Sequence, residues 1–147
     1  PYTTLFRSHN AKGKPWRVGI NKPVEDSTST VSEIEQVVEL TRGGMATSGN
    51  YRNFYIKDGR KYAHTIDPRE GCPVQRDILS ATIVAPDAMT ADAYATAFMV
   101  LGSEEAKSLC AKVPGLDYFI ICSDSIGDGY HPEYSEGFRR YMVTADK

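Results

Sequence analysis

Residues 45–73 read M-A-T-S-G-N-Y-R-N-F-Y-I-K-D-G-R-K-Y-A-H-T-I-D-P-R-E-G-C-P. Two β-rich runs, 51–56 and 61–66, flank Asp58-Gly59, and Asp-Gly between such runs is a strong signal for a two-residue hairpin turn. Closing the turn there sets a register that pairs Lys57 with Arg60, Tyr55 with Tyr62 and Asn53 with His64. The stretch therefore predicts a β-hairpin around which the rest of the chain is arranged.

Polar groups gather at the open end of this predicted hairpin. Thr47-Ser48-Gly49 precedes the first run as an expected turn, and His64 and Asp67 end the second run beside Pro68. A glycine beside two hydroxyls lets backbone N–H groups approach an anion closely. The same residues also suit a hairpin with an ordinary hydrogen-bonded turn at each end, and the residues alone leave both interpretations open.

The order of motifs in this stretch resembles the central signature of the ApbE-type flavin transferases. T-S-G-x-Y (47–51) is followed by H-T-I-D-P-x-x-G-x-P (64–73), by L-S-A-T-I-V-A (79–85) and by A-D-A-Y-A-T-A-F-M-V-L-G (91–102). The resemblance covers about residue 14 to the C-terminus and corresponds to the C-terminal half of such a protein. Residues 1–8 do not fit the family and are interpreted as a non-native scar, so residues 9–147 are expected to form the C-terminal part of one ApbE-like domain.

Composition indicates one globular domain rather than a basic or membrane-spanning protein. The 147 residues are 41% hydrophobic and 24% charged, with a net charge of −2. Neither a basic block nor an apolar run of about 20 residues is present, so nothing suggests a nucleic-acid partner or a membrane span. The three cysteines follow no CxxC spacing and are expected to be small buried residues.

Apolar periodicity predicts an α+β fold in which a helix pair packs on a largely antiparallel sheet. This corresponds to the C-terminal part of the ApbE-like, T-fold-like architecture. Residues 33–40 suit a helix or a strand, and we favour a strand over 36–40. Residues 72–77 and the surroundings of His131 are expected to be irregular. The remaining predicted strands cover 16–20, 79–85 and 117–122, a further short element covers 137–143, and helices begin at the caps Thr90 and Ser103, the first ending at Gly102.

Asp92 and Thr96 lie four residues apart on the first predicted helix, which stacks a carboxylate and a hydroxyl on one face. Such a pair suits Mg²⁺, which takes oxygen ligands from protein, water and phosphates. Asp92 could instead complement the helix dipole, and Thr96 could bond to its own helix. In the family, the Asp and Thr of this A-D-A-x-x-T motif are Mg²⁺ ligands, so the resemblance implies a metal site at Asp92 and Thr96.

The resemblance further implies an enzyme that transfers FMN from FAD to a threonine hydroxyl of a target protein, such as a respiratory or redox subunit, and releases AMP. Thr47, Ser48, Gly49, His64 and Asp67 would contact FAD, with His64 as general acid or base and Asp67 fixing the turn at Pro68 or orienting His64. For one pyrophosphate to reach all of these groups, the Asp92/Thr96 face must point towards Thr47–Gly49 and His64.

Two alternatives remain: an FAD-binding or FAD-hydrolysing module without protein flavinylation, and a fragment that is inactive alone. The resemblance implies an extracytoplasmic location, in the periplasm or at the inner membrane, through a lipid anchor on an N-terminal part that this chain lacks. The other histidines are weak candidates, since His9 lies near the N-terminus and His131 is expected on the surface. Ser123, Asp124 and Ser125 with His131 could form a hydrolase set, but no G-x-S-x-G motif supports it.

Overall fold

The computed structural model describes residues 13–23, 33–50, 54–57, 60–63, 65–124 and 129–143, with the backbone alone at 54–57 and 60–63. The predicted scar at 1–8, His9, the Asp58-Gly59 turn, His64 and Ser125 therefore lie outside the described residues. The elements run in the order β1 (Trp16–Asn21), β2 (Ile34–Leu40), β3 (Gly44–Gly49), β4 (Phe54–Lys57), β5 (Arg60–Ala63), β6 (Ile66–Asp67), β7 (Cys72–Pro73), β8 (Ile78–Ala85), α1 (Ala88–Leu101), α2 (Ser103–Cys110), β9 (Asp117–Ser123), β10 (Tyr130–Tyr134), the 3-10 helix η1 (Glu136–Tyr141) and β11 (Met142–Val143).

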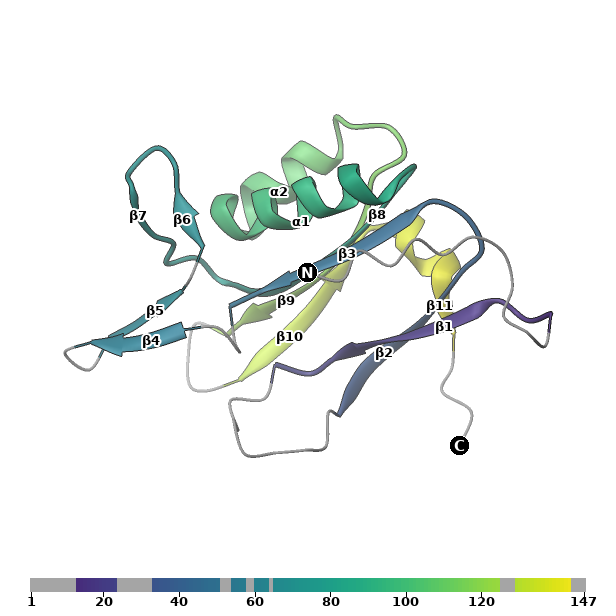
Figure 1. The fold of residues 1–147 in the computed structure, drawn as a ribbon, viewed down its shortest axis with the longest axis horizontal. Coiled ribbons are helices and arrows are strands. Elements are labelled where there is room, and N and C mark those ends of the chain that lie inside the picture. The colour runs from purple at the N-terminus through teal and green to yellow at the C-terminus, as the bar shows by residue number, and fades with distance from the viewer. Residues whose placement is uncertain are drawn as a thin grey trace.

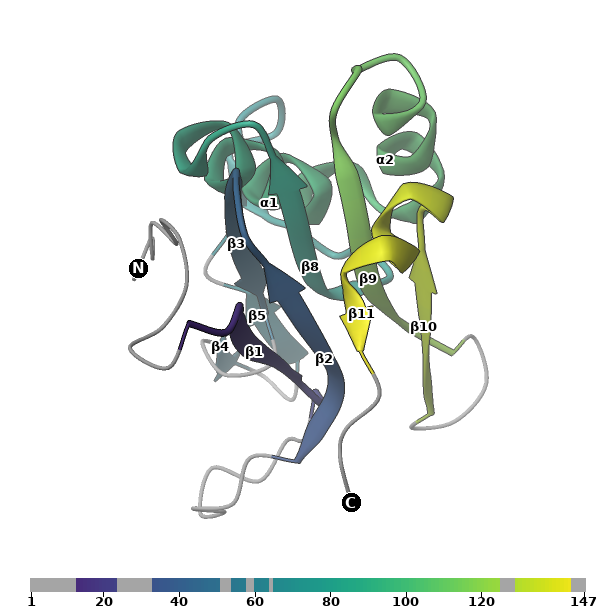
Figure 2. The ribbon, with the colours of Figure 1, turned by 90° about the vertical axis from the view of Figure 1, so that its right-hand side faces the viewer.

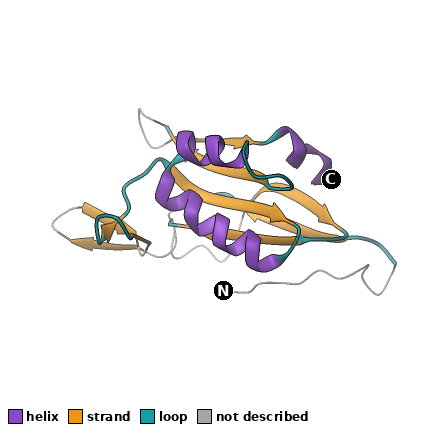
Figure 3. Ribbon diagram, turned by 90° about the horizontal axis from the view of Figure 1, so that it is seen from above, coloured by secondary structure: helices purple, strands orange, loops and turns teal. Residues whose placement is uncertain are grey.

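A four-stranded sheet of order β10-β9-β8-β3 forms the middle layer of the described fold. Helices α1 and α2 cover one face of this sheet, and the three-stranded sheet β1-β2-β11 lies against its other face (Figures 1 and 2). Figure 3 shows the two helices lying over the strands of the sheet. All strand pairs of these two sheets are antiparallel, so the predicted α+β fold is confirmed.

Strand β8 is the centre of the sheet because its apolar run can be buried on both faces. Ala81 and Ile83 point into the cluster beneath the helices, whereas Val84 joins the cluster beneath β1 and β2. Side chains alternate between the faces of a strand, so a near-continuous apolar run is stable only where both faces are covered. The prediction of a doubly buried strand at this position is confirmed.

Helix α1 begins and ends close to the predicted residues, but its N-terminal cap is Asp87 rather than Thr90. The Asp87 carboxylate accepts hydrogen bonds of 2.8 Å from the backbone N–H and from the hydroxyl of Thr90. Strand β8 ends just before Asp87, which keeps an extended backbone and so takes the cap position. Gly102, with φ of 83°, ends the helix as predicted.

Helix α2 is capped from another segment, and not by Ser103 as predicted. Ser103 is the first residue of the helix, and its backbone N–H donates to the Asp77 carboxylate at 3.0 Å while its hydroxyl also hydrogen-bonds that carboxylate. Gly102 occupies the cap position and has no side chain with which to do so. The start of α2 is therefore tied to the segment that leads into β8.

The central hairpin has the predicted register over its described residues, and the third predicted pair, Asn53 with His64, lies outside them. Tyr55 pairs with Tyr62 and Lys57 with Arg60. The second strand ends at Ala63, however, and Ile66 begins a separate strand, β6, which pairs with Cys72–Pro73 of β7. The predictions that the second strand reaches Ile66 and that 72–77 is wholly irregular are therefore wrong.

Three further segments test the strand predictions. Residues 34–40 form strand β2, so the choice of strand over helix is confirmed. Thr47–Gly49 is the end of strand β3 and not a turn, since it pairs with Ser80–Thr82 of β8. His131-Pro132 lies in the edge strand β10 and not in a turn, and an edge position tolerates proline because its missing N–H can face outward.

The cysteine prediction holds for two of the three residues. Cys110 and Cys122 are buried, whereas Cys72 is exposed. Among the described residues, no helix combines the length and the apolar character that crossing a membrane requires.

Candidate functional site

Two of the hydroxyl-bearing motifs, T-S-G and A-D-A-x-x-T, come into contact where helix α1 packs on strand β3. The Oγ of Ser48 lies 3.3 Å from the Oγ1 of Thr96. Ser48 shares a face of β3 with Ala46, which packs against the cluster beneath the helices. The expectation that the Asp92/Thr96 helix face points towards the Thr47–Gly49 segment is confirmed at Thr96.

Thr47 points the other way, because neighbouring side chains in a strand alternate between its faces. Its hydroxyl lies 2.8 Å from the hydroxyl of Thr82 in β8, and Val84 on the same face of β8 belongs to the cluster beneath β1 and β2. Thr47-Ser48-Gly49 therefore does not act as one anion-binding turn. Only the Ser48 hydroxyl is presented to α1.

Asp92 and Thr96 are exposed and lie one turn apart on α1. The first turn of α1 holds no acidic residue, so the alternative in which Asp92 complements the helix dipole from the first turn is wrong. Among the described residues, no hydrogen bond or ion pair engages the Asp92 carboxylate. Thr96, one helical turn further on, contacts Ser48, and carboxylate and hydroxyl oxygens of these kinds are donors that suit Mg²⁺.

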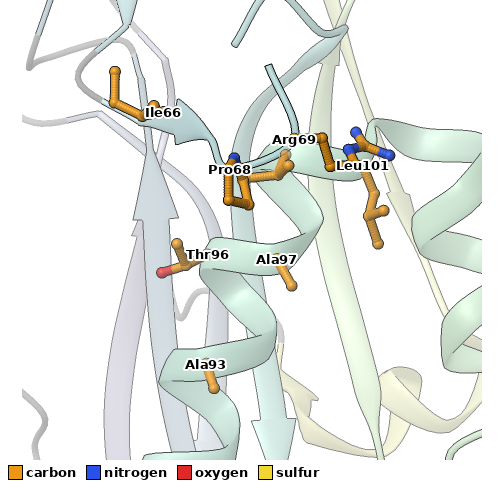
Figure 4. Close-up of a pocket in the computed structure, with 8 residues that line it drawn as sticks. Ile66, Pro68, Arg69, Ala93, Thr96, Ala97 and Leu101 are labelled. Atoms are coloured by element: carbon orange, nitrogen blue, oxygen red, sulfur yellow. The ribbon is translucent and has the colours of Figure 1, made fainter. Parts of the chain in front are cut away.

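A cleft of about 500 Å³ lies between helix α1 and the turn that follows β6. In Figure 4, Ile66 and Pro68 lie above the helix from which Ala93, Thr96 and Ala97 project. The walls are mainly apolar, and Thr96 and Arg69 supply the polar groups. The cleft is lined by Ile66, Pro68, Arg69, Ala93, Thr96, Ala97, Val100 and Leu101.

Asp67 fixes the turn that forms one wall of this cleft. The Arg69 backbone N–H donates to its carboxylate at 2.9 Å, and the Arg69 guanidinium binds the same carboxylate at 2.7 Å. The Asp67 carbonyl accepts from the Gly71 N–H at 2.8 Å. Hydrogen bonds from the Arg69 side chain, and then from its backbone, lower the pKa of Asp67 to about 2. The predicted role of Asp67 in fixing the turn at Pro68 is confirmed, and its contact with a ligand stays a prediction.

His64 lies outside the described residues, so its predicted role stays a prediction. Its chain neighbour Thr65 donates from its hydroxyl to the Asn50 side chain at 3.2 Å, and Asn50 directly follows β3. Two motifs that are far apart in the sequence, T-S-G-N and H-T-I-D-P, are thereby joined next to the cleft.

Sequence reasoning missed the walls of the cleft and the cation at its rim. Arg69 lines the cleft and is held there by Asp67. The small apolar residues Ala93, Ala97 and Val100 recur at positions i, i+4 and i+7 of one helix face, and this spacing could have indicated a second apolar stripe on α1.

The sequence model of the ApbE family matches residues 5–120. The chain belongs to the ApbE family. A relative from Salmonella typhimurium named FAD:protein FMN transferase is 37% identical over 138 residues, which are 94% of this chain and 37% of that protein. An Escherichia coli protein of the same name is 38% identical, with the same coverage of both chains. The chain therefore spans little more than a third of the length of these relatives.

Solved structures of ApbE proteins have the same fold. The ApbE protein from Thermotoga maritima superposes with a TM-score of 0.73 at 31% identity, over 92% of this chain and 41% of that one. The flavin transferase ApbE from Vibrio cholerae gives a TM-score of 0.72 at 34% identity, over 91% of this chain and 40% of that one. The antiparallel sheet with its helix pair is thus the ApbE architecture over the matched part.

Proposed function

We propose that this chain, within a whole ApbE-family protein, takes part in Mg²⁺-dependent transfer of FMN from FAD to a threonine hydroxyl of a target protein, with release of AMP. The names of the ApbE relatives support the flavin transfer. The observation that carries the site assignment is the 3.3 Å approach of Ser48 to Thr96. It joins the T-S-G and A-D-A-x-x-T motifs beside a cleft that H-T-I-D-P also lines.

The reaction exchanges one phosphorus–oxygen bond for another. The threonine oxygen of the target forms a bond to the flavin-side phosphorus of FAD, the bond from that phosphorus to the bridging oxygen breaks, and AMP leaves. The hydroxyl proton passes to a base, and we assign that role to His64, whose ordinary pKa of about 6.5 suits it. Alignment and charge neutralisation are the main demands of such a transfer.

Asp92 and Thr96 would hold the metal ion, which when bound would neutralise negative charge on the phosphate oxygens. The exposed Asp92 carboxylate suits this role because no described residue already engages it. The Ser48 hydroxyl, 3.3 Å from that of Thr96, would accept a hydrogen bond from the Thr96 hydroxyl, which positions it, and would donate its own proton to a phosphate oxygen. The Ser48 hydroxyl can do both, since it has one proton to donate and lone pairs to accept with.

The cleft would receive one aromatic end of FAD. Its volume of about 500 Å³ lies within the usual range for small-molecule pockets, and its alanine and proline walls suit a flat ring. Arg69 at the rim would face the negatively charged part of the nucleotide. Because Asp67 holds the guanidinium, Arg69 would offer a positioned cation at little entropic cost.

The test uses a full-length protein that contains this chain, with FAD, Mg²⁺ and a threonine-bearing target protein, and follows flavin fluorescence of the target in a denaturing gel. We expect Asp92→Ala to slow transfer by about 100-fold or more, equivalent to about 3 kcal/mol. Thr96→Ala should slow it less, because water can replace a hydroxyl ligand. The control is Glu136→Ala, an exposed acid on η1, which should transfer normally.

Wild-type turnover by Asp92→Ala would contradict the metal assignment. Release of AMP and FMN without labelling of the target would instead favour the alternative, an FAD-hydrolysing module. The two outcomes are distinguished by measuring AMP release and target fluorescence in the same reaction.

A further inference from the structure

A second group of ligand-type side chains lies on β9 and β10, the two strands farthest from β3 in the four-stranded sheet. His131 of β10 is the register partner of Cys122 of β9, and Glu133 follows two residues later on the same face. One ligand atom each from Cys122, His131 and Glu133 lie within 4.8 Å of one another. Figure 2 shows β9 and β10 side by side with α2 beside their upper ends.

The imidazole of His131 is oriented by a carboxylate outside this trio. Its Nδ1 lies 2.6 Å from Oδ1 of Asp124, and its Nε2 lies 3.3 Å from Oε1 of Glu133. When Nδ1–H donates to Asp124, Nε2 carries the free lone pair. Metal-ligating histidines almost always have such a partner, which selects the tautomer and the ring orientation.

One oxygen of the Glu133 carboxylate is fixed by a lysine of α2. Lys107 of α2 donates to its Oε2 at 3.0 Å, whereas its other oxygen, Oε1, faces His131. Lys107 is further bound to Glu104 at 2.7 Å. The second oxygen of Glu133 is thus directed towards His131 by contacts that a bound cation need not break.

We propose that Cys122, His131 and Glu133 form a binding site for a zinc-class divalent cation, with Asp124 as a positioning residue. Thiolate, imidazole and carboxylate together suit Zn²⁺ or Co²⁺, whereas Mg²⁺ and Ca²⁺ prefer oxygen ligands alone. Binding replaces the proton of the Cys122 thiol, which passes to solvent as the sulfur–metal bond forms. Three protein ligands leave the fourth tetrahedral position to water.

The geometry is close to what such a site needs. Tetrahedral zinc places neighbouring ligand atoms about 3.5 Å apart, given bonds of about 2.0–2.3 Å. The 3.3 Å between Nε2 of His131 and Oε1 of Glu133 already matches this spacing, and the other distances, at most 4.8 Å, need to shorten by about 1.3 Å at most. The bound cation would cross-link edge strand β10 to β9 on the side that faces α2.

The competing arrangement is a protonated His131 held between two carboxylates without a metal. Hydrogen bonds that the imidazole donates to the carboxylate of Asp124, and then to that of Glu133, raise the pKa of His131. In that case the cluster would be an ion-pair network with Lys107, and the Cys122 sulfur would not bind an added transition metal. Spectroscopy that reports a sulfur–metal bond distinguishes the two.

The probe is Co²⁺, titrated into the metal-free 147-residue chain in the presence of excess Mg²⁺. We expect the near-ultraviolet thiolate-to-cobalt charge-transfer band and the intense visible bands of four-coordinate Co²⁺, at one ion per chain, and their loss when Zn²⁺ is added. Cys122→Ser and His131→Ala should remove the charge-transfer band. Cys72→Ser, which replaces an exposed thiol outside the cluster, should retain it.

Asp124→Asn should keep the band but weaken Co²⁺ affinity by about 10- to 100-fold, the usual effect of losing an orienting partner. Because Cys122 is buried, Cys122→Ser needs a circular dichroism check of its fold, and His131→Ala, which changes an exposed residue, gives a second test. A wild-type chain without the band, a band that survives His131→Ala, or a band that depends on Cys72 would overturn the proposal. None of these measurements depends on flavin transfer.

Discussion

Phe98→Ala is expected to destabilise the chain more than any change to the exposed face of α1. Phe98 is fully buried in the cluster between α1 and the four-stranded sheet, and its ring centroid lies 5.8 Å from that of Tyr118 in β9. It lies two residues after Thr96, on the opposite side of the same helix. Packing of this ring therefore helps to hold the helix that carries Asp92 and Thr96 against the four-stranded sheet.

The expected cost follows from the surface and the cavity involved. Truncation to alanine removes roughly 100 Å² of buried apolar surface, which at about 25 cal/mol per Å² gives about 2.5 kcal/mol. The cavity left behind adds to this, because the sheet relaxes only in part, and buried Phe→Ala changes cost about 3–5 kcal/mol in total. Domains are typically stable by about 5–15 kcal/mol, so this is a large share.

Urea unfolding followed by far-ultraviolet circular dichroism measures the effect. We expect a lower midpoint with an unchanged m-value. Met89→Ala on the same helix is the matched control, since Met89 is 80% exposed and its truncation should stay within about 0.5 kcal/mol of wild type. A Phe98→Ala cost below about 1 kcal/mol, or an equal cost for Met89→Ala, would refute the described packing of α1.

Two further predictions concern the start of β3 and the turn that follows β6. Gly44→Ala should destabilise the chain by about 3 kcal/mol in the same urea assay, because an added Cβ would overlap the backbone of Ala88 at the start of α1. The control Gly71→Ala, with no atom within 4 Å of its added Cβ and φ of 66°, should cost only about 1 kcal/mol of backbone strain. Equal losses of stability in the two variants would contradict the close approach of Gly44 to Ala88. The pKa of Asp67, lowered from 3.8 to about 2, predicts a stabilising contribution that is complete above pH 4 and lost as the pH falls towards 2. Asp67→Asn should abolish that part of the pH dependence of the urea midpoint, and an unchanged acid profile would show that the Asp67–Arg69 pair does not form.

Local sequence was sufficient to predict an element where its hydrophobic pattern or its turn residues match the structure that the fold requires. Residues 79–85 are apolar except for Ser80 and Thr82, and such a run in this fold is stable only between two covered faces, as β8 is. The end of α1 at Gly102 follows from the left-handed conformation that glycine adopts readily. The hairpin register likewise follows from Asp-Gly, because the pairs nearest a two-residue turn are determined by the turn itself.

Prediction failed where a segment owes its structure to a distant partner. Thr47-Ser48-Gly49 has the composition of a turn, yet it continues β3 because the backbone of β8 lies alongside it. His131-Pro132 is a strand only because β9 supplies the pairing. Strand propensity is weak beside such pairing, so no local pattern marks either segment.

The sequence alone contains three motifs in a fixed order: T-S-G, H-T-I-D-P and A-D-A-x-x-T. Their resemblance to the ApbE family was enough to identify the family and the candidate residues. Whether those residues meet was decided by tertiary structure alone. Ser48 contacts Thr96 because α1 crosses the helix-facing side of β3, while its neighbour Thr47 is turned to the opposite face by strand alternation. In the same way, Cys122, His131 and Glu133 come together through the register of β9 and β10. Contacts of this kind depend on which backbones pair over long separations, and the free energy of that pairing belongs to the whole fold and not to any one segment.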